Sequence, residues 1–242
     1  MMVIAAVLAG GSGSRMGNAD IPKQFLLLGG RPILAHTVEK FLRHPEIDCV
    51  LVLCPKAWLA QTREMLARFL PGAEQAEVIA GGETRNGTLE NALRYMEETY
   101  PQQEDAVIVT HDAVRPFLTH RIISENIAAA RKYGATDTVV PATDTIVCSA
   151  DGDFIDSIPP RNTMYQGQTP QAFRAGKLRR LLEILTDEER ASLTDACMIF
   201  SLKGEPVYLV PGNVHNFKIT YPQDLEIAQV LLRQEENADG DD

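Results

Sequence analysis

A glycine-rich loop near the amino end of the chain brings cations next to backbone donors. Residues 9–17 read A-G-G-S-G-S-R-M-G, and Arg15 within them is followed eight residues later by Lys23. Glycines that follow a first strand let backbone N–H groups approach a phosphate closely. Two cations flanking such donors suit in-line attack on a nucleotide α-phosphate, because charge collects on the phosphoryl oxygens and on the leaving diphosphate. The segment therefore predicts phosphoryl-transfer chemistry rather than a turn without a ligand.

Two familiar nucleotide-binding loops do not fit these residues. A Walker A loop ends in Gly-Lys, whereas Gly17 is followed by Asn18. The dinucleotide fingerprint G-x-G-x-x-G lacks its third glycine, because Met16 stands there. No acidic residue closes the candidate second strand, which ends at Cys54. Both a Walker-type nucleotide triphosphatase and a nicotinamide dehydrogenase are therefore disfavoured.

The string G-G-x-G-x-R-M-x5-P-K resembles the signature of sugar-nucleotide pyrophosphorylases, and in particular of a cytidylyltransferase family that makes CDP-polyols. The similarity continues, in the family's order, through G-G-E-T-R-N-G-T (81–88), H-D-A-V-R-P (111–116), T-D-T (143–145), Q-T-P-Q (168–171), L-T-D-A (193–196) and F-K-I-T-x-P-x-D-L (217–225). It covers nearly the whole chain. The resemblance implies a CTP-dependent nucleotidyltransferase with a Rossmann-like nucleotidyltransferase fold.

The same resemblance implies a role for individual residues. Arg15 and Lys23 match stabilisers of the transition state, and Arg161 and Lys218 match residues that position the acceptor phosphate. The positions implied to hold CTP are Leu8, Ala9, Gly10, Gly11, Gly81, Gly82, Glu83, Thr84, Arg85, Asn86, Gly87, Thr88, Thr110 and Asp112. Those implied to contact the acceptor are Arg115, Thr145, Thr169 and Thr194. His111 is not expected to act as a general base, because a phosphate nucleophile is already ionised at neutral pH.

Asp112 is the candidate metal ligand of the chain. It follows the hydrophobic run A-V-I-V-T (106–110) at the edge where open α/β sheets bind ligands. A carboxylate there would repel phosphates unless a cation intervenes. We expect it to contact Mg²⁺, carried mainly by the triphosphate, or a ribose hydroxyl. An ion pair with Arg115 that caps a turn is the structural alternative.

The acceptor is predicted to be a five-carbon polyol phosphate. The strings H-D-A-V-R-P-F-L-T-H-R-I-I and M-Y-Q-G-Q-T-P-Q resemble the branch of the family that uses D-ribitol 5-phosphate for teichoic acid precursors. The first alternative is the branch that uses 2-C-methyl-D-erythritol 4-phosphate in isoprenoid synthesis. The second is a non-catalytic nucleotide-binding regulator on the same fold, because fold alone does not determine function. A pure binding protein would not need both stabilising cations.

The elements that must position these residues alternate along the chain. Short apolar runs at 3–8, 49–54, 77–80, 106–110 and 138–141 predict strands, and amphipathic stretches at 32–44, 56–70, 86–99 and 119–133 predict helices. Continuous apolar strands alternating with helices indicate a mainly parallel sheet covered on both faces. We therefore predict a three-layer α/β fold.

After residue 141 this alternation stops. Residues 142–170 predict a β-hairpin arm, followed by helices at 174–186 and 194–201, a strand at 206–210 and a closing helix at 222–234. We expect one nucleotidyltransferase domain over residues 1–234 and a disordered acidic tail at 235–242. A lone hairpin with exposed apolar residues such as Ile146 and Ile155 predicts an obligate homodimer. By resemblance, the arm would carry Thr145 toward the partner's acceptor site.

Composition limits the other function classes. Thirty-three acidic against 23 basic residues give a net charge of −10, so the chain lacks the basic excess needed for nucleic acid. The longest apolar run, residues 1–9, is too short for a membrane span and has no basic flank typical of a signal peptide. The four cysteines show no metal or disulfide spacing, so we expect buried free thiols in a protein of the reducing cytoplasm.

Overall fold

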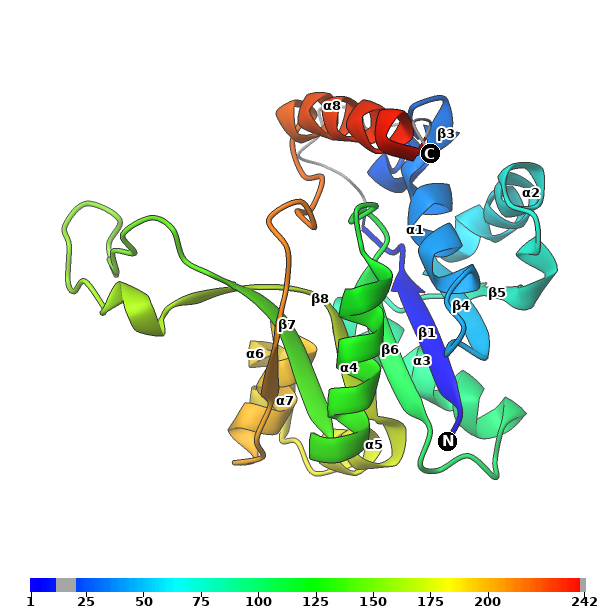
Figure 1. Ribbon diagram of the computed structural model, residues 1–242. Coiled ribbons are helices and arrows are strands. Elements are labelled where there is room, and N and C mark those ends of the chain that lie inside the picture. The colour runs from blue at the N-terminus through cyan, green and yellow to red at the C-terminus, as the bar shows by residue number, and fades with distance from the viewer. Residues whose placement is uncertain (12–20, 240–242) are drawn as a thin grey trace.

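A seven-stranded sheet forms the centre of the computed structural model, which describes residues 1–11 and 21–239 (Figure 1). Its strand order is β5-β4-β1-β6-β8-β7-β9, and every strand except β8 points the same way. The strands are β1 (Val3–Leu8), β4 (Cys49–Cys54), β5 (Ala76–Ala80), β6 (Val107–Asp112), β7 (Ala135–Pro141), β8 (Tyr165–Arg174) and β9 (Tyr208–Pro211). The predicted three-layer α/β fold with a mainly parallel sheet is confirmed.

Helices cover both faces of the sheet because its central strands are apolar on both sides. Val3, Ala5 and Val7 of β1 pack into one core, while Ile4 and Ala6 pack into the other. The first core is closed by α1 (Ile33–Leu42), α2 (Leu59–Phe69) and α4 (His120–Tyr133). The second is closed by α3 (Arg85–Thr99), α5 (Ala175–Glu183) and α7 (Ala196–Leu202).

A third, smaller core joins the two ends of the chain. The hairpin of β2 (Leu27–Leu28) and β3 (Arg31–Pro32) packs with α8 (Pro222–Asp239) around Leu28, Ile219 and Ala228. Helix α8 was predicted to end at residue 234 before a disordered tail, but it continues to Asp239. Glutamate, glutamine and alanine are good helix formers, so the acidic composition extends the helix instead of ending it.

Local signals set several helix ends as the sequence predicts. The Thr119 hydroxyl accepts from the Ile122 backbone N–H at the start of α4, and Gly134 ends the helix with φ of +94°. A short helix that was not predicted, α6 (Asp187–Ser192), begins with a reciprocal capping pair between Thr186 and Glu189. The helix predicted at 174–186 ends earlier, as α5 at Glu183, and α6 begins after Thr186.

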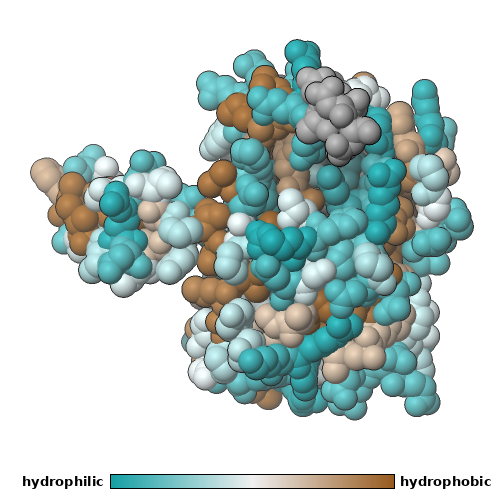
Figure 2. Space-filling view, viewed as in Figure 1, coloured by the Kyte–Doolittle hydropathy of each residue, from teal (hydrophilic) through white to brown (hydrophobic). Residues whose placement is uncertain are grey.

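The segment predicted as a hairpin arm divides into two parts. Its second part becomes β8, which lies between β6 and β7 and pairs antiparallel with both. Residues 142–164, called the arm below, extend away from the body, as Figures 1 and 2 show. A bridge between Cys148 and Ser157 links the two sides of the arm. The arm is therefore confirmed as a projection, but its returning side continues as a central strand of the sheet.

The cysteine prediction is correct for three of the four thiols. Cys49, Cys54 and Cys197 are buried and unpaired, whereas Cys148 is unpaired but exposed because it lies on the arm. No helix within residues 1–11 and 21–239 is long and apolar enough to cross a membrane.

Candidate active site

A cavity of about 520 Å³ lies at the carboxyl ends of β1 and β6, beside the start of α3. Twelve of the predicted site residues line it: Leu8, Ala9, Gly10, Gly11, Lys23, Gly82, Glu83, Thr84, Arg85, Thr88, Asp112 and Lys218. Gln24, Ala113, Val114 and Thr220 complete the lining. The topology thus brings together five chain segments that are far apart in the sequence.

The loop before α3 forms one wall of the cavity and folds tightly around Thr88. The Thr88 hydroxyl donates to the Thr84 backbone oxygen at 2.8 Å and accepts from the Gly82 N–H at 3.0 Å. A Cβ at Gly82 would lie 2.4 Å from the Gly87 carbonyl carbon, so the two backbones meet too closely for any side chain. Because the start of α3 lines the cavity, the positive end of the helix dipole faces the cavity and favours a bound phosphate.

Asp112 lies at the centre of a cluster of cations. Its Oδ1 accepts from Arg85 Nη1 at 2.5 Å, and its Oδ2 accepts from Lys218 Nζ at 3.1 Å and from Arg115 Nε at 3.3 Å. Burial alone would raise the pKa of Asp112, but the charges of Arg85, Lys218 and Arg115 outweigh it and hold the pKa well below the usual carboxyl range. Three cations against one carboxylate leave an excess of positive charge, so the cluster attracts anions.

His111 is buried in the core next to this cluster and supports it through hydrogen bonds. Its Nε2 lies 3.1 Å from the Arg115 backbone oxygen, which can only accept, so Nε2 carries the proton. Its Nδ1 then accepts from the Thr169 hydroxyl at 2.9 Å, and the same hydroxyl oxygen accepts from the Asp112 N–H at 3.1 Å. Burial lowers the pKa of His111 to about 4, so the ring is neutral near pH 7. His111 is therefore a neutral brace.

Lys23 lies inside the cavity on the short 3-10 helix η2 (Lys23–Phe25). Its ammonium group donates to the Ile219 backbone oxygen at 3.0 Å, although the side chain is almost fully buried. Gln24, which the sequence analysis did not single out, donates through Nε2 to the Ala9 backbone oxygen at 2.6 Å. These two neighbours fasten the glycine loop and the segment around Lys218 to the same short helix.

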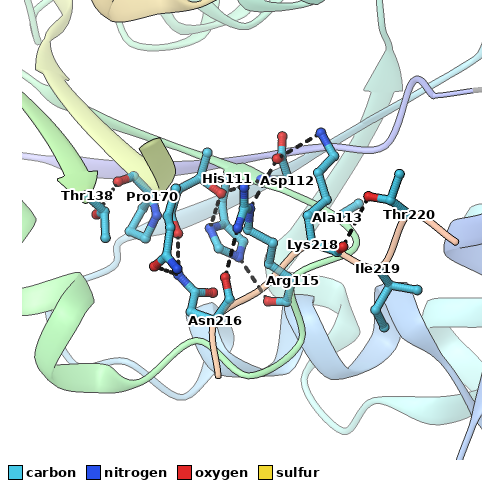
Figure 3. A network of polar contacts seen from close by, with 12 residues as sticks. His111, Asp112, Ala113, Arg115, Thr138, Pro170, Asn216, Lys218, Ile219 and Thr220 are labelled. Atoms are coloured by element: carbon cyan, nitrogen blue, oxygen red, sulfur yellow. Dashed lines mark hydrogen bonds and ion pairs between the residues drawn. The ribbon is translucent and has the colours of Figure 1, made fainter. Parts of the chain in front are cut away.

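Lys218 reaches Asp112 from a loop that precedes α8, as Figure 3 shows. The Ile219 N–H donates to the Val114 oxygen at 3.0 Å, which joins this loop to the segment after β6. At the other end, the Asn216 backbone oxygen accepts from Arg115 Nη1 at 2.8 Å. The loop is thus held on both sides of Lys218.

Several predicted site residues lie outside the cavity lining. Thr110 is buried and donates to the Gln171 backbone oxygen, and Asn86 donates to the Leu193 oxygen. Gly81 and Gly87 shape the loop before α3 without lining the cavity. The proton of the Thr169 hydroxyl is directed to His111, so its expected role as a donor to the acceptor is not what this arrangement supplies.

The remaining acceptor residues are scattered. Thr145 and Arg161 lie on the arm, where Arg161 Nη1 donates to the Thr143 oxygen at 3.2 Å. Thr194 is exposed just before α7. Arg115 is buried and forms an ion pair with Asp112. Arg15 is outside the described residues. One chain therefore brings Lys23, Lys218 and most of the positions predicted to bind CTP together, but not Arg161 and Thr145.

The described residues contain no group of three or more His, Cys, Asp and Glu side chains that could hold a metal ion. Asp112 supplies one carboxylate, and both of its oxygens accept from cations. A single carboxylate is compatible with Mg²⁺ that takes most of its ligands from phosphates and water. The donor set does not fit a metal held by protein alone.

The fold and the cavity define the class of the protein: an α/β enzyme whose cations and helix N-terminus are arranged for a nucleotide triphosphate. A family model described as IspD, 2-C-methyl-D-erythritol 4-phosphate cytidylyltransferase, matches residues 3–234. The chain belongs to this family. It is a CTP-dependent cytidylyltransferase, as the sequence predicts.

Solved structures of similar proteins agree with the family. The 4-diphosphocytidyl-2C-methyl-D-erythritol synthase of Anaerococcus prevotii is 29% identical, with a TM-score of 0.79 over 96% of each chain. The 2-C-methyl-D-erythritol 4-phosphate cytidylyltransferase of Thermus thermophilus is 29% identical, with a TM-score of 0.72 over 96% of this chain and 100% of that one. The enzyme of the same name from Francisella tularensis is 27% identical, with a TM-score of 0.77 over 94% of this chain and 98% of that one.

Proposed function

We propose that this enzyme transfers the cytidylyl group of CTP to 2-C-methyl-D-erythritol 4-phosphate and releases diphosphate. The observation that carries the proposal is the convergence of Lys23, Lys218 and the backbone of the glycine loop in one cavity. The choice of acceptor is supported by the matching family and by the names of the similar structures. The sequence motifs favour D-ribitol 5-phosphate, with methylerythritol phosphate as the alternative, whereas the comparisons support the alternative better.

D-ribitol 5-phosphate stays as the second candidate acceptor. It is favoured by the strings H-D-A-V-R-P-F-L-T-H-R-I-I and M-Y-Q-G-Q-T-P-Q, which resemble the ribitol branch. Both candidates present a terminal phosphate on a hydroxylated carbon chain. The chemistry at the phosphorus atom is therefore the same for either.

In the reaction, an oxygen of the acceptor phosphate forms a bond to the α-phosphorus of CTP. The bond from that phosphorus to the bridging oxygen breaks, and diphosphate leaves with the electron pair. Lys23 would bind phosphoryl oxygens and stabilise the added charge in the transition state, together with Arg15. Lys218, which is partly exposed beside Asp112, would hold the attacking phosphate. No side chain needs to remove a proton, because the acceptor phosphate is ionised.

The phosphates of the two bound substrates would redistribute the cations around Asp112, with CTP competing for Arg85 and the acceptor for Lys218. In the ligand-free arrangement Arg85 and Lys218 pair with this carboxylate. Phosphates compete for the same cations, which frees Asp112 to contact Mg²⁺ or a ribose hydroxyl. Mg²⁺, when bound, neutralises phosphate charge and orients the leaving diphosphate.

The acceptor site would be completed by a second copy of the chain. Arg161 and Thr145 lie on the arm, which extends away from the cavity of its own chain (Figure 1). The arm exposes Val147, Phe154, Ile155 and Ile158. Burying these side chains against a two-fold-related copy would stabilise a homodimer and bring the arm to the partner's cavity. The unpaired thiols suit an enzyme of the reducing cytoplasm.

The test of the function is diphosphate release with CTP and each acceptor in separate reactions. We expect turnover with methylerythritol phosphate, and none with the dephosphorylated polyol, which lacks the nucleophile. Turnover with ribitol 5-phosphate alone would overturn the first acceptor and establish the second. Equal rates with GTP in place of CTP would contradict the pyrimidine preference that both candidates share.

A further inference from the structure

We infer that Asn216 is a positioning residue, which holds the acceptor side of the active site together without touching either substrate. Asn216 is fully buried and lies two residues before Lys218, in the loop that precedes α8. Its side-chain amide donates to the Thr169 backbone oxygen at 2.7 Å and to Gln168 Oε1 at 3.2 Å. Asn216 therefore bonds the loop before α8 to β8, two segments that are 47 residues apart.

The backbone of Asn216 extends this connection to a third segment. Its carbonyl oxygen accepts from Arg115 Nη1 at 2.8 Å, and the Arg115 oxygen in turn accepts from the neutral His111 ring. Figure 3 shows Asn216 below Arg115, with His111 and Asp112 above it. One residue thus links Arg115 after β6, Thr169 on β8 and the loop that carries Lys218.

Gln168, on β8, adds further hydrogen bonds to the same loop. Its Nε2 donates to the Asn213 backbone oxygen at 2.9 Å, and its Oε1 accepts from the Asn213 N–H at 3.4 Å as well as from Asn216. A Cβ at Gly212 would lie 2.5 Å from Gln168 Oε1, so the loop passes directly over this amide. The side-chain amides of Gln168 and Asn216 therefore bond the start of the loop that carries Lys218 to β8.

The far end of the same loop is held by contacts that do not involve Asn216. Asp224 Oδ2 accepts from the N–H groups of Thr220 and Tyr221, and the Ile219 oxygen accepts from Lys23. Within the described part of the chain, the hydrogen bonds of Asn216 go to Thr169, Gln168, Arg115 and Asn213, and none goes to the start of α3 or to residues 8–11, the side proposed to bind CTP. Loss of the Asn216 amide should therefore loosen Arg115 and Lys218 while leaving CTP binding in place.

The role rests on the proposed function, because it assumes that Arg115 and Lys218 bind the acceptor phosphate. It also deepens that function by separating the two substrates. Asn216→Ala removes the amide, and Asn216→Asp keeps its shape but puts an acceptor against the Thr169 oxygen. Asn213→Ala is the matched control, since the hydrogen bond of the Asn213 side chain among the described residues is to the His215 N–H of its own loop.

The first measurement is hydrogen–deuterium exchange of the ligand-free protein. The Asn216 and Ile219 amides are both bonded to backbone oxygens and report the order of the loop. We expect exchange of the Asn216 and Ile219 amides to be about tenfold faster in both Asn216 variants and unchanged in Asn213→Ala, which removes the bond of the His215 amide instead. This measurement needs no substrate, so it tests the link even if neither acceptor is used. Unchanged exchange in Asn216→Ala would overturn the inference.

The second measurement is steady-state kinetics with the acceptor that the wild-type enzyme uses. Displacement of positioned groups by about 1 Å costs roughly 100-fold, so we expect kcat/KM for the acceptor to fall about 10- to 100-fold. The KM for CTP should stay within about twofold of wild type. A merely structural role would raise both KM values together or change neither, and either result would refute a positioning role on the acceptor side. Failure of the wild-type enzyme with both acceptors would instead refute the proposed function.

Discussion

At the scale of single residues, the site works by placing charge rather than by supplying an acid or base. Asp112 is surrounded by Arg85, Arg115 and Lys218, and its pKa is held below the ordinary range. The carboxylate pairs with all three cations, and in the proposed mechanism it holds them in place until phosphates bind. Removing a single cation should therefore affect the rate far more than the fold.

Lys23→Ala should lower kcat about 10²- to 10³-fold, because one donor to a transition-state oxyanion is lost. Lys23 is buried and bonded to the Ile219 oxygen, so Lys23→Met, which keeps most of the stem, separates loss of charge from loss of packing. Lys56→Ala, at an exposed position of the short 3-10 helix η3 (Lys56–Trp58), is the control. Steady-state rates decide the matter: a Lys23→Met enzyme within threefold of wild type would remove Lys23 from the mechanism.

Gly82→Ala should weaken CTP binding, and Gly82→Val should do so more strongly. The added Cβ would approach the Gly87 and Thr88 backbone to within 2.4–2.8 Å, so the loop before α3 must shift. Such overpacking costs about 1–3 kcal/mol of unfolding free energy. Gly167→Ala is the matched control, because its Cβ would meet only Asp137 Oδ2 at an ordinary 3.6 Å. Calorimetric titration with CTP should show weaker binding for Gly82→Ala but not for Gly167→Ala. Equal affinities of these two variants for CTP would contradict a role of the close backbone approach in CTP binding.

His111 should make stability depend on pH between about 6.5 and 4. Its folded pKa is lowered to about 4, whereas the unfolded value is 6.5, so the unfolded chain takes up a proton first as the pH falls. The stabilisation from neutral His111 is therefore complete above pH 6.5 and is lost as the pH falls toward 4, by about 3 kcal/mol at most. Urea unfolding at a series of pH values should show a steeper loss for wild type than for His111→Gln. Parallel curves would rule this linkage out.

At the scale of elements, the sequence predicts what local periodicity controls. The apolar runs of β1 and β4, the capped start of α4 and the carboxyl-end position of Asp112 follow from composition within a few residues. Strand β8 could not be found in this way. Its polar Q-T-P-Q segment is buried because Gln168, Thr169 and Gln171 all have partners on neighbouring segments.

The candidate site divides in the same manner. The glycine loop and Lys23 are marked by type and spacing, and the resemblance places Lys218 and Arg85 correctly in the cavity. Gln24 and Asn216 carry no such mark, because their contacts join segments 15 and 47 residues apart that only the folded chain brings together. The internal use of the Thr169 hydroxyl likewise depends on His111, 58 residues away.

At the scale of the whole molecule, the arm is a large feature that the body of the chain leaves uncovered. Phe154 is 77% exposed and Ile155 is 62% exposed, and both belong to the arm, which projects from the body in Figures 1 and 2. Ile146 is already half-buried within its own arm, whereas Phe154 and Ile155 are exposed, so the latter two are the better positions to test the interface. Phe154→Asp with Ile155→Asp should yield a monomer by light scattering, whereas Asp153→Ser on the same arm should not.

A shared acceptor site also makes a prediction that monomer formation alone does not. If Arg161 of one chain serves the cavity that holds Lys218 of the other, then Arg161→Ala and Lys218→Ala each inactivate the homodimer. In a mixed dimer, however, one of the two cavities keeps both residues, because the two substitutions fall together in the other cavity. Coexpression of the two variants in equal amounts should restore about a quarter of the wild-type rate, since half of the dimers are mixed and each has one intact site of two.

The opposite arrangement gives a different result in the same experiment. If Arg161 acted in the cavity of its own chain, every cavity of a mixed dimer would lack one of the two cations, and no activity would return. The control is coexpression of Arg161→Ala with itself under two affinity tags, purified through both, which should stay inactive. Recovery in the mixed preparation, together with loss of that recovery when Phe154→Asp and Ile155→Asp are added to both chains, would tie the exchange of arms to catalysis. A wild-type chain that is monomeric at micromolar concentration and fully active would refute the shared site.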